Sequence, residues 1–265
     1  MPATRAMPVK PMDGDGSAAT SLGRGAPRSY DRAVPVLTEA HGDRVTLVTI
    51  DRQERRNAVD RDAVEAIRSA AEAATGVLVL TGAGGHFCSG ADLTTLEDAA
   101  FAALVRDTCA ALARAELVTI AAADGAALGA GTQFAVACDL RVSTPGAKFG
   151  IPAGKLGVAL DASTVARVAA LAGGGPARAM LLGGEVVDGE AAHRFGLVQR
   201  LGSLDDALAW AAEIAALAPL TLAAHKVALE GGDSSAAYDR AWSSADVAEG
   251  LAAFKEKRPP VFRGT

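Results

Sequence analysis

The sequence predicts an α/β protein, and two patterns carry this prediction. In the first two-thirds of the chain, short segments rich in β-branched residues alternate with longer segments whose apolar residues recur at helical spacing. In the last third, almost every segment has helical spacing. Such alternation is typical of βα units, and we expect the helical remainder to form a cap or an assembly surface.

The composition is that of a globular chain. Of the 265 residues, 50% are hydrophobic and 22% are charged, which excludes a disordered protein. With 26 basic and 31 acidic side chains the net charge is −5, so nucleic acid is not an expected partner. Cys88, Cys109 and Cys138 are far apart, and no metal-ligand spacing joins them to a histidine. These thiols fit a reducing, cytoplasmic location.

Two segments of the sequence bear on targeting and on membrane insertion. Residues 1–33 are rich in Pro, Gly, Ser and Arg and lack the hydrophobic stretch of a signal peptide, so we expect a flexible tail. The longest apolar stretch, 117–140, is interrupted by Asp124, by glycines and by Gln133. A membrane span needs about 20 largely unbroken apolar residues, so we expect none here.

Strands are predicted where β-branched and aliphatic residues cluster. The expected strands are 44–50, 77–80, 117–122 and 139–143, with a short last strand near Leu197–Val198.

Helices are predicted from the spacing of apolar residues. In 61–74 the residues Val64, Ile67 and Ala71 recur as on one helix face, and Asp60 or Asp62 is available as the N-cap. Further helices are expected over 94–114, up to Ala137, and almost continuously from Asp161, with turns at 173–176, 183–184 and 231–232.

Two glycine-rich turns, 81–92 and 124–131, each leave a predicted strand and enter a predicted helix. A helix start carries free N–H groups and a partial positive charge, and glycine lets a ligand approach closely. Facing each other, the turns would aim two N–H donors at one oxygen, as in an oxyanion hole. The alternative is that both are only tight connections. Neither has the glycine spacing of a nucleotide-binding loop.

Several segments together resemble the enoyl-CoA hydratase/isomerase (crotonase) family. The main ones are 52–58 (RQERRNA), 85–93 (GHFCSGADL) and 124–139 (DGAALGAGTQFAVACD), and 149–152, 183–199 and 254–258 continue the match. The resemblance runs in order from about residue 40 to the C-terminus.

This resemblance implies a fold, an assembly and a ligand. The fold would be a crotonase-like ββα spiral core over 34–200, followed by a C-terminal helical trimerisation region over 201–265, with 1–33 as the tail. The expected assembly is a homotrimer or a dimer of trimers. The expected ligand is a coenzyme A thioester, an acyl-CoA or enoyl-CoA, with no separate cofactor and no metal.

The resemblance also implies binding residues. The backbone N–H groups of Ala91 and Ala130 would form the oxyanion hole, although the family normally has glycine at the second position. Lys257 and Arg258 match a basic pair that reaches the coenzyme A on a neighbouring subunit, whereas a solvated helix end is the simpler interpretation. The expected substrate-binding residues are Arg55, Arg56, Ala91, Asp92, Leu93, Ala130, Lys257 and Arg258.

The sequence departs from the family at both catalytic carboxylates. A hydratase of this family moves protons with two glutamates, and the matching positions here are Gln133 and Ala153. Neither side chain takes up or releases a proton near neutral pH. Losing general acid–base help costs roughly 10²–10⁴-fold per group, so we expect little or no hydration. An isomerase would lack its single base as well.

One carboxylate is left as a candidate. Asp161 matches the nucleophile of the family's aryl-CoA dehalogenases, but it also precedes an apolar helix and fits an N-cap. A dehalogenase needs a histidine to activate water, and none occurs near Arg106 in the matching helix.

The missing glutamates, with 155–161 and 256–260, resemble an actinobacterial hydratase-like branch that keeps the acyl-CoA pocket. We therefore expect a protein of fatty-acid metabolism that binds acyl-CoA and passes acyl groups to fatty-acid synthesis partner proteins. The alternatives are an active enzyme of altered enolate chemistry that uses Asp161, and a purely structural or interaction protein.

Overall fold

Six strands form the main sheet of the computed structural model, which describes residues 35–92 and 98–265. These residues belong to one compact unit, Val34–Thr265. The strands lie in the order β1-β2-β3-β4-β6-β9; β1 runs antiparallel to β2 and every other pair is parallel. Their bounds are β1 (Val36–Ala40), β2 (Val45–Ile50), β3 (Val77–Gly82), β4 (Val118–Ala123), β6 (Leu140–Ser143) and β9 (Arg200–Leu201).

A second, three-stranded sheet lies close to the candidate site. Its strands are β5 (Ala126–Leu128), β7 (Lys148–Gly150) and β8 (Val187–Asp188), with β5 and β7 parallel and β8 antiparallel to β7.

The helices connect and cover these strands. A 3₁₀ turn, η1 (Gln53–Arg55), precedes α1 (Arg61–Ala73), α2 (Ala99–Arg114), α3 (Ala130–Ala137), α4 (Ala153–Leu156), α5 (Ala162–Ala172) and α6 (Gly174–Leu181). The later helices are α7 (Gly189–Arg194), α8 (Leu204–Ala215), α9 (Pro219–Leu229), α10 (Ser235–Trp242) and α11 (Ala245–Glu256).

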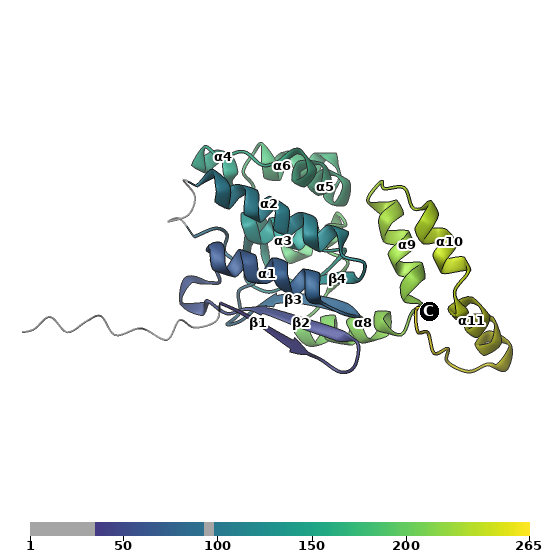
Figure 1. The fold of residues 1–265 in the computed structure, drawn as a ribbon. Helices are drawn as coiled ribbons and strands as arrows, with labels where there is room; N and C mark the ends of the chain where they lie inside the picture. The colour runs from purple at the N-terminus through teal and green to yellow at the C-terminus, as the bar shows by residue number, and fades with distance from the viewer. Residues whose placement is uncertain (1–34, 93–97) are drawn as a thin grey trace, which may run out of the picture. The chain divides into compact units, whose positions relative to one another are not determined.

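Both faces of the main sheet are covered, because successive side chains of a strand point to opposite faces. In β3, Leu78 and Leu80 pack with α1, α2 and α3, whereas Val77 and Val79 pack against Ala211 and its neighbours on α8. Figure 1 shows α1 and α2 on one side of the strands and α8 on the other. Parallel strands buried on both faces are typically this rich in Val, Ile and Leu.

Five of the described α-helices begin with a short polar side chain that caps the first turn. Asp60, Asp98 and Asp161 each accept a hydrogen bond from a backbone N–H in the first turn of α1, α2 and α5. Ser203 and Asp206 form a capping box at the start of α8. Such caps satisfy N–H groups that have no partner inside the helix, which is why these elements begin where they do.

A buried ion pair joins α9 to the sheet. The Lys226 ammonium lies 2.7 Å from the Asp139 carboxylate and donates to the carbonyls of Leu112 and Leu117 at 3.3 and 2.9 Å. Asp139 also accepts from the N–H and the hydroxyl of Thr119 at 2.7 and 2.9 Å. Buried charges require such compensation, so these contacts fix α9 against the end of β4.

The predicted α/β class is confirmed, and β2, α1, β3, β4, α3 and β6 lie at or within a few residues of their predicted bounds. The last strand is β9 at Arg200–Leu201, three residues after the prediction, and Leu197 and Val198 precede it as buried core side chains. The turn predicted over 173–176 is confined to Gly173, since α6 begins at Gly174.

Helix α2 also begins later than predicted. Asp98 caps it and Ala99 is its first residue, while residues 93–97, part of the predicted helix over 94–114, lie outside the described residues. The predicted tail, 1–33, lies outside them as well.

In the part of the chain that the structure describes, no single helix is long and apolar enough to cross a membrane. The pair α8 and α9, bent by 109°, meets the criteria of length and composition only when taken together.

Candidate functional site

The two glycine-rich turns lie side by side, joined like two parallel strands. The Phe87 N–H donates to the Asp124 carbonyl and the Cys88 N–H to the Ala126 carbonyl, both at 2.8 Å. The Leu128 N–H returns to the Cys88 carbonyl at 2.9 Å. These bonds place the ends of the two turns together, as the sequence predicts for turns that form one site.

Glycine is required where the second turn enters α3. Gly129 has φ 54°, a left-handed conformation that glycine adopts without steric cost, and its N–H donates to the Gly150 carbonyl at 2.9 Å. A Cβ at Gly131 would lie 2.2 Å from the Cys88 carbonyl oxygen, so only glycine lets the turns approach this closely. The Thr132 hydroxyl accepts from the Gly150 N–H at 3.0 Å and anchors α3 to β7.

The N–H groups of Ala91 and Ala130 are among those without an acceptor at this junction. On either side of Ala91, the N–H groups of Ser89 and Asp92 donate to the carbonyls of Arg56 and Val59 at 3.0 and 2.8 Å. Ala130 is the first residue of α3, where an N–H has no partner inside the helix. Among the described residues, no protein acceptor takes the N–H of Ala91 or of Ala130.

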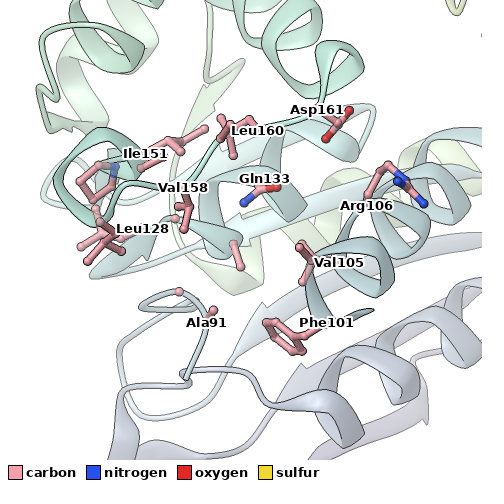
Figure 2. Close-up of a pocket in the computed structure, with 18 of the residues that line it drawn as sticks. Ala91, Phe101, Val105, Arg106, Leu128, Gln133, Ile151, Val158, Leu160 and Asp161 are labelled. Atoms are coloured by element: carbon pink, nitrogen blue, oxygen red, sulfur yellow. The ribbon is translucent and has the colours of Figure 1, made fainter. Parts of the chain in front are cut away.

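Both alanines line one cavity of about 470 Å³. Figure 2 shows Ala91 and Phe101 on one side, Ile151, Val158 and Leu160 on the other, and Gln133 between them. Most of the lining is apolar: Phe101 and Val105 come from α2, and Ile151, Leu156, Val158 and Leu160 from the segment 151–161. The arrangement pairs an apolar chamber with two backbone donors.

Gln133 and Ala153, the positions of the replaced glutamates, both line this cavity. Gln133 lies one turn into α3, and its own N–H donates to the Gly129 carbonyl at 3.1 Å. Ala153 is the first residue of α4 and carries only a methyl group. Neither side chain acts as an acid or base near neutral pH.

The ionisable side chains of the described lining are Asp98, Arg106 and Asp161, and each has a partner. Asp98 accepts from the Ala100 N–H and pairs with Arg61 at 2.6 Å, and the Ala100 bond is the main cause of its lowered pKa. Arg106 pairs with the neighbouring Asp107 at 2.9 Å.

Asp161 caps α5, so the simpler of its two predicted interpretations is confirmed. Its carboxylate accepts from the Thr164 N–H at 3.0 Å, from the Thr164 hydroxyl at 2.7 Å and from the Ser163 hydroxyl. Burial opposes ionisation of this carboxyl, but the hydrogen bonds from Ser163 and Thr164 outweigh burial and lower its pKa. A carboxylate held in this way is a weak base.

The predicted binding residues Arg55, Arg56 and Asp92 do not line the cavity. Asp92 is buried and pairs with Arg55 at 2.8 Å and Arg52 at 3.5 Å, which holds the turn that carries Ala91. Arg56 is exposed with φ 51°. Leu93, the remaining predicted residue of this turn, lies outside the described residues.

Lys257 and Arg258 follow α11 and do not line the cavity. Arg258 pairs with Glu249 and with Glu256, both at 2.6 Å, and these hydrogen bonds raise its pKa further. Lys257 is exposed and caps the helix with φ 55°. Of the basic pair, Arg258 is therefore paired within the chain and Lys257 is exposed.

Sequence reasoning missed Asn57, which shapes the first turn. It is fully buried with φ 58°, its Oδ1 accepts from the Arg52 N–H at 2.9 Å, and its Nδ2 donates to the Ala83 carbonyl at 2.8 Å. Asn is one of the few residues enriched in the left-handed region, which is a usable signal. In the described residues, no group of three His, Cys, Asp or Glu side chains could hold a metal ion.

Comparisons with known proteins point to one family. The family model for enoyl-CoA hydratase/isomerase matches residues 40–265. A probable enoyl-CoA hydratase of Mycobacterium leprae, echA6, is 42% identical over 248 residues, which cover 86% of this chain and 98% of that protein. A second mycobacterial relative, echA8 of Mycobacterium tuberculosis, is a probable enoyl-CoA hydratase with 34% identity over 83% of this chain and 94% of its own length.

Solved structures agree in fold. A crystal structure of an "enoyl-CoA hydratase/ carnithine racemase" from Magnetospirillum magneticum superposes with a TM-score of 0.80 at 30% identity, covering 87% of this chain and 96% of that one. A probable enoyl-CoA hydratase/isomerase from Mycobacterium abscessus gives 0.77 at 34% identity, covering 88% and 100%.

Proposed function

Because this chain belongs to the enoyl-CoA hydratase/isomerase family, we propose that it binds acyl-CoA thioesters at the cavity between the two glycine turns. The N–H groups of Ala91 and Ala130 hold the thioester carbonyl oxygen, and the acyl chain lies among the apolar side chains. The observation that carries this proposal is the pair of N–H groups without a protein acceptor on one apolar cavity.

The geometry suits a thioester in particular. A carbonyl oxygen accepts two hydrogen bonds, and preorganised backbone donors stabilise negative charge on that oxygen at no cost of reorganisation. The donor at Ala130 is reinforced by the partial positive charge of the start of α3.

Proton transfer is where this site differs from a hydratase. Hydration needs a group that delivers a proton and a group that takes one from water, and Gln133 and Ala153 do neither. Asp98 and Asp161 are already engaged as helix caps with lowered pKa values. We therefore propose that the protein binds enoyl-CoA but hydrates it little or not at all.

We assign the protein a role in fatty-acid metabolism in the cytoplasm, as a carrier or regulator that passes acyl groups to fatty-acid synthesis partner proteins. In this proposal Arg55 and Arg56 contact the coenzyme A phosphates. Lys257 and Arg258 reach the coenzyme A of a neighbouring subunit. These roles follow from the family's motifs.

The proposed assembly is a homotrimer or a dimer of trimers. Large apolar side chains on the C-terminal helices support it: Leu229 and Phe254 are each 85% exposed and Trp242 is 63% exposed. Exposed apolar patches of this kind mark surfaces of association.

The alternative is an active enzyme in which Asp161 acts as base or nucleophile on an enolate held by the oxyanion hole. One observation favours it, since Asp161 lines the cavity. Its three hydrogen bonds and lowered pKa make it a weaker base than a free carboxylate, so binding without turnover is the preferred proposal.

The proposed carbonyl contact is testable because the N–H of Ala130 can be removed without breaking α3. Proline is tolerated at the first position of a helix, so Ala130→Pro removes this donor, with a ring carbon in its place, and keeps the start of the helix. One hydrogen bond contributes about 0.5–1.5 kcal/mol, so the dissociation constant of an acyl-CoA, measured by calorimetry, should rise about two- to tenfold.

The matched control is the acyl-CoA thioether, which has the same chain but no carbonyl oxygen. It should bind the wild type and Ala130→Pro equally. Equal weakening for thioester and thioether would contradict the carbonyl contact. Failure of the wild type to bind any acyl-CoA would favour a structural or interaction protein instead.

A further inference from the structure

A second apolar cavity lies behind one wall of the first. It has a volume of about 450 Å³ and lies between the segment 151–160 and the helices α5 and α6. The chain contributes Val165 and Ala169 from α5 and Ala177 and Leu181 from α6. Arg178 is the ionisable member of its described lining, and its guanidinium donates to the Gly174 carbonyl at 3.1 Å.

The wall between the two cavities is one residue thick. The same side chains border the first cavity on one side and the second on the other: Ile151, Ala153, Val158, Ala159 and Leu160. Ala153 and Ala159 each contribute only a methyl group. A glutamate at position 153 would place a larger side chain between the two cavities. Alanine at this position therefore removes a proton carrier and also leaves a thinner barrier between the cavities.

The wall is held to the helices behind it by apolar contact. The N–H groups of Lys155 and Val158 donate to the carbonyls of Pro152 and Ala153 within the same segment. Among the described residues, no hydrogen bond or ion pair joins 154–160 to α5 or α6. Displacing the segment therefore breaks no hydrogen bond to those helices, which makes local opening inexpensive.

We propose that the second cavity receives the far end of a long acyl chain whose thioester lies at Ala91 and Ala130. The chain passes the wall at Ala153 and Ala159, and the ligand class is long-chain fatty acyl-CoA. This inference rests on the proposed function, since it places the tail of the same ligand. The lining supports the assignment: both cavities are lined mainly by apolar side chains, which favour a neutral hydrocarbon tail.

The proposal predicts how affinity depends on chain length. Burying one methylene strengthens binding by about fourfold, so affinity should continue to rise after the first cavity is full. Blocking the second cavity should remove only the gain in binding affinity that comes from the last methylenes of the chain. The readout is the ratio of the dissociation constants of butanoyl-CoA and hexadecanoyl-CoA, measured by calorimetry below the concentration at which the long chain forms micelles.

Val165→Trp fills the second cavity from α5, where the native side chain is 41% exposed and extra bulk is tolerated. Leu182→Trp fills it independently from the end of α6. Each variant should lower the ratio about 15- to 60-fold, equivalent to two or three lost methylenes. Ala166→Trp is the matched control, because Ala166 is exposed on the same helix and lines neither cavity, and its ratio should equal that of the wild type.

The outcomes separate the inference from the proposed function. If butanoyl-CoA and hexadecanoyl-CoA both fail to bind the wild type, the proposed function fails. If both bind and neither tryptophan changes the ratio, the inference is overturned. If a tryptophan variant keeps the wild-type ratio of dissociation constants but has a different mass in sedimentation, the inference is also overturned. The face formed by α5 and α6 is then assigned to contact between copies of the chain. A hexadecanoyl-CoA with a diazirine on its last carbon should cross-link to residues 165–182, whereas labelling confined to α2 would contradict the proposal.

Discussion

At the scale of single residues, the replaced glutamates decide the chemistry. Gln133 and Ala153 line the same cavity as Ala91 and Ala130, so carboxylates at these positions would lie near a thioester bound there. Gln133→Glu with Ala153→Glu should raise the hydration of a trans-2-enoyl-CoA by roughly 10²–10⁴-fold for each carboxylate that acts, because it restores both proton carriers. The loss of enoyl absorbance measures the rate.

The control for this gain is Ala153→Gln in the wild-type background. It fills the same space as glutamate without an ionisable group, so hydration should stay at the wild-type level. No gain in the double glutamate variant would show that the geometry of the cavity, and not only its proton carriers, differs from that of a hydratase.

Asp161 provides a second residue-scale prediction. Because it caps α5, Asp161→Ala should lower the free energy of unfolding by about 0.5–2 kcal/mol, whereas Asp161→Asn, which also caps, should cost little. Neither change should alter any turnover of acyl-CoA. Unfolding in urea and product analysis test the two statements, and loss of turnover in Asp161→Asn would revive the alternative function.

The pKa of Asp161 gives this prediction a pH dependence. Its folded-state pKa lies below the unfolded value of about 3.9, so the ionised carboxylate stabilises the fold above that pH. The contribution is lost as the pH falls through the folded-state pKa. The stability difference between the wild type and Asp161→Asn should therefore be larger at neutral pH than at about pH 3.

At the scale of elements, the sequence predicts periodic segments well and very short ones poorly. The strands β2 and β3 are runs of β-branched and aliphatic residues, and the helix α1 has a clear helical period. Strands β5 and β7 have three residues each and exist because they pair with each other, which is a tertiary event without a local signal. Helix α4 is only one turn long, which is too short for a helical period to be detected in the sequence.

The junction of α9 with the sheet is the element-scale prediction. Lys226→Met leaves Asp139 without its cation in a largely buried place, so the free energy of unfolding should fall by about 3–5 kcal/mol. Chemical denaturation measures it. The exposed pair Arg240–Glu116, at 3.7 Å, supplies the control: Arg240→Met should cost less than about 1 kcal/mol. An equally small loss for Lys226→Met would show that α9 is held by apolar packing alone.

At the scale of the whole molecule, the crotonase-like fold that the motifs predict is confirmed by the family model and by the solved structures. The motifs also predicted that Ala91 and Ala130 share one site, and both residues line the same cavity. Residues such as Phe101, Val158 and Leu160 were not predicted as lining, because a cavity depends on how helices pack and not on any one segment. The second cavity is the same case: α4, α5 and α6 create it jointly.

The central claim is that this fold binds an enoyl thioester without moving protons. The most direct measurement is mass spectrometry of trans-2-enoyl-CoA, short and long, incubated with the protein in heavy water. The account predicts unchanged substrate, recovered bound to the protein and free of deuterium beside the thioester. A hydrated product formed at the rate of an ordinary hydratase, or deuterium at that carbon, would contradict it.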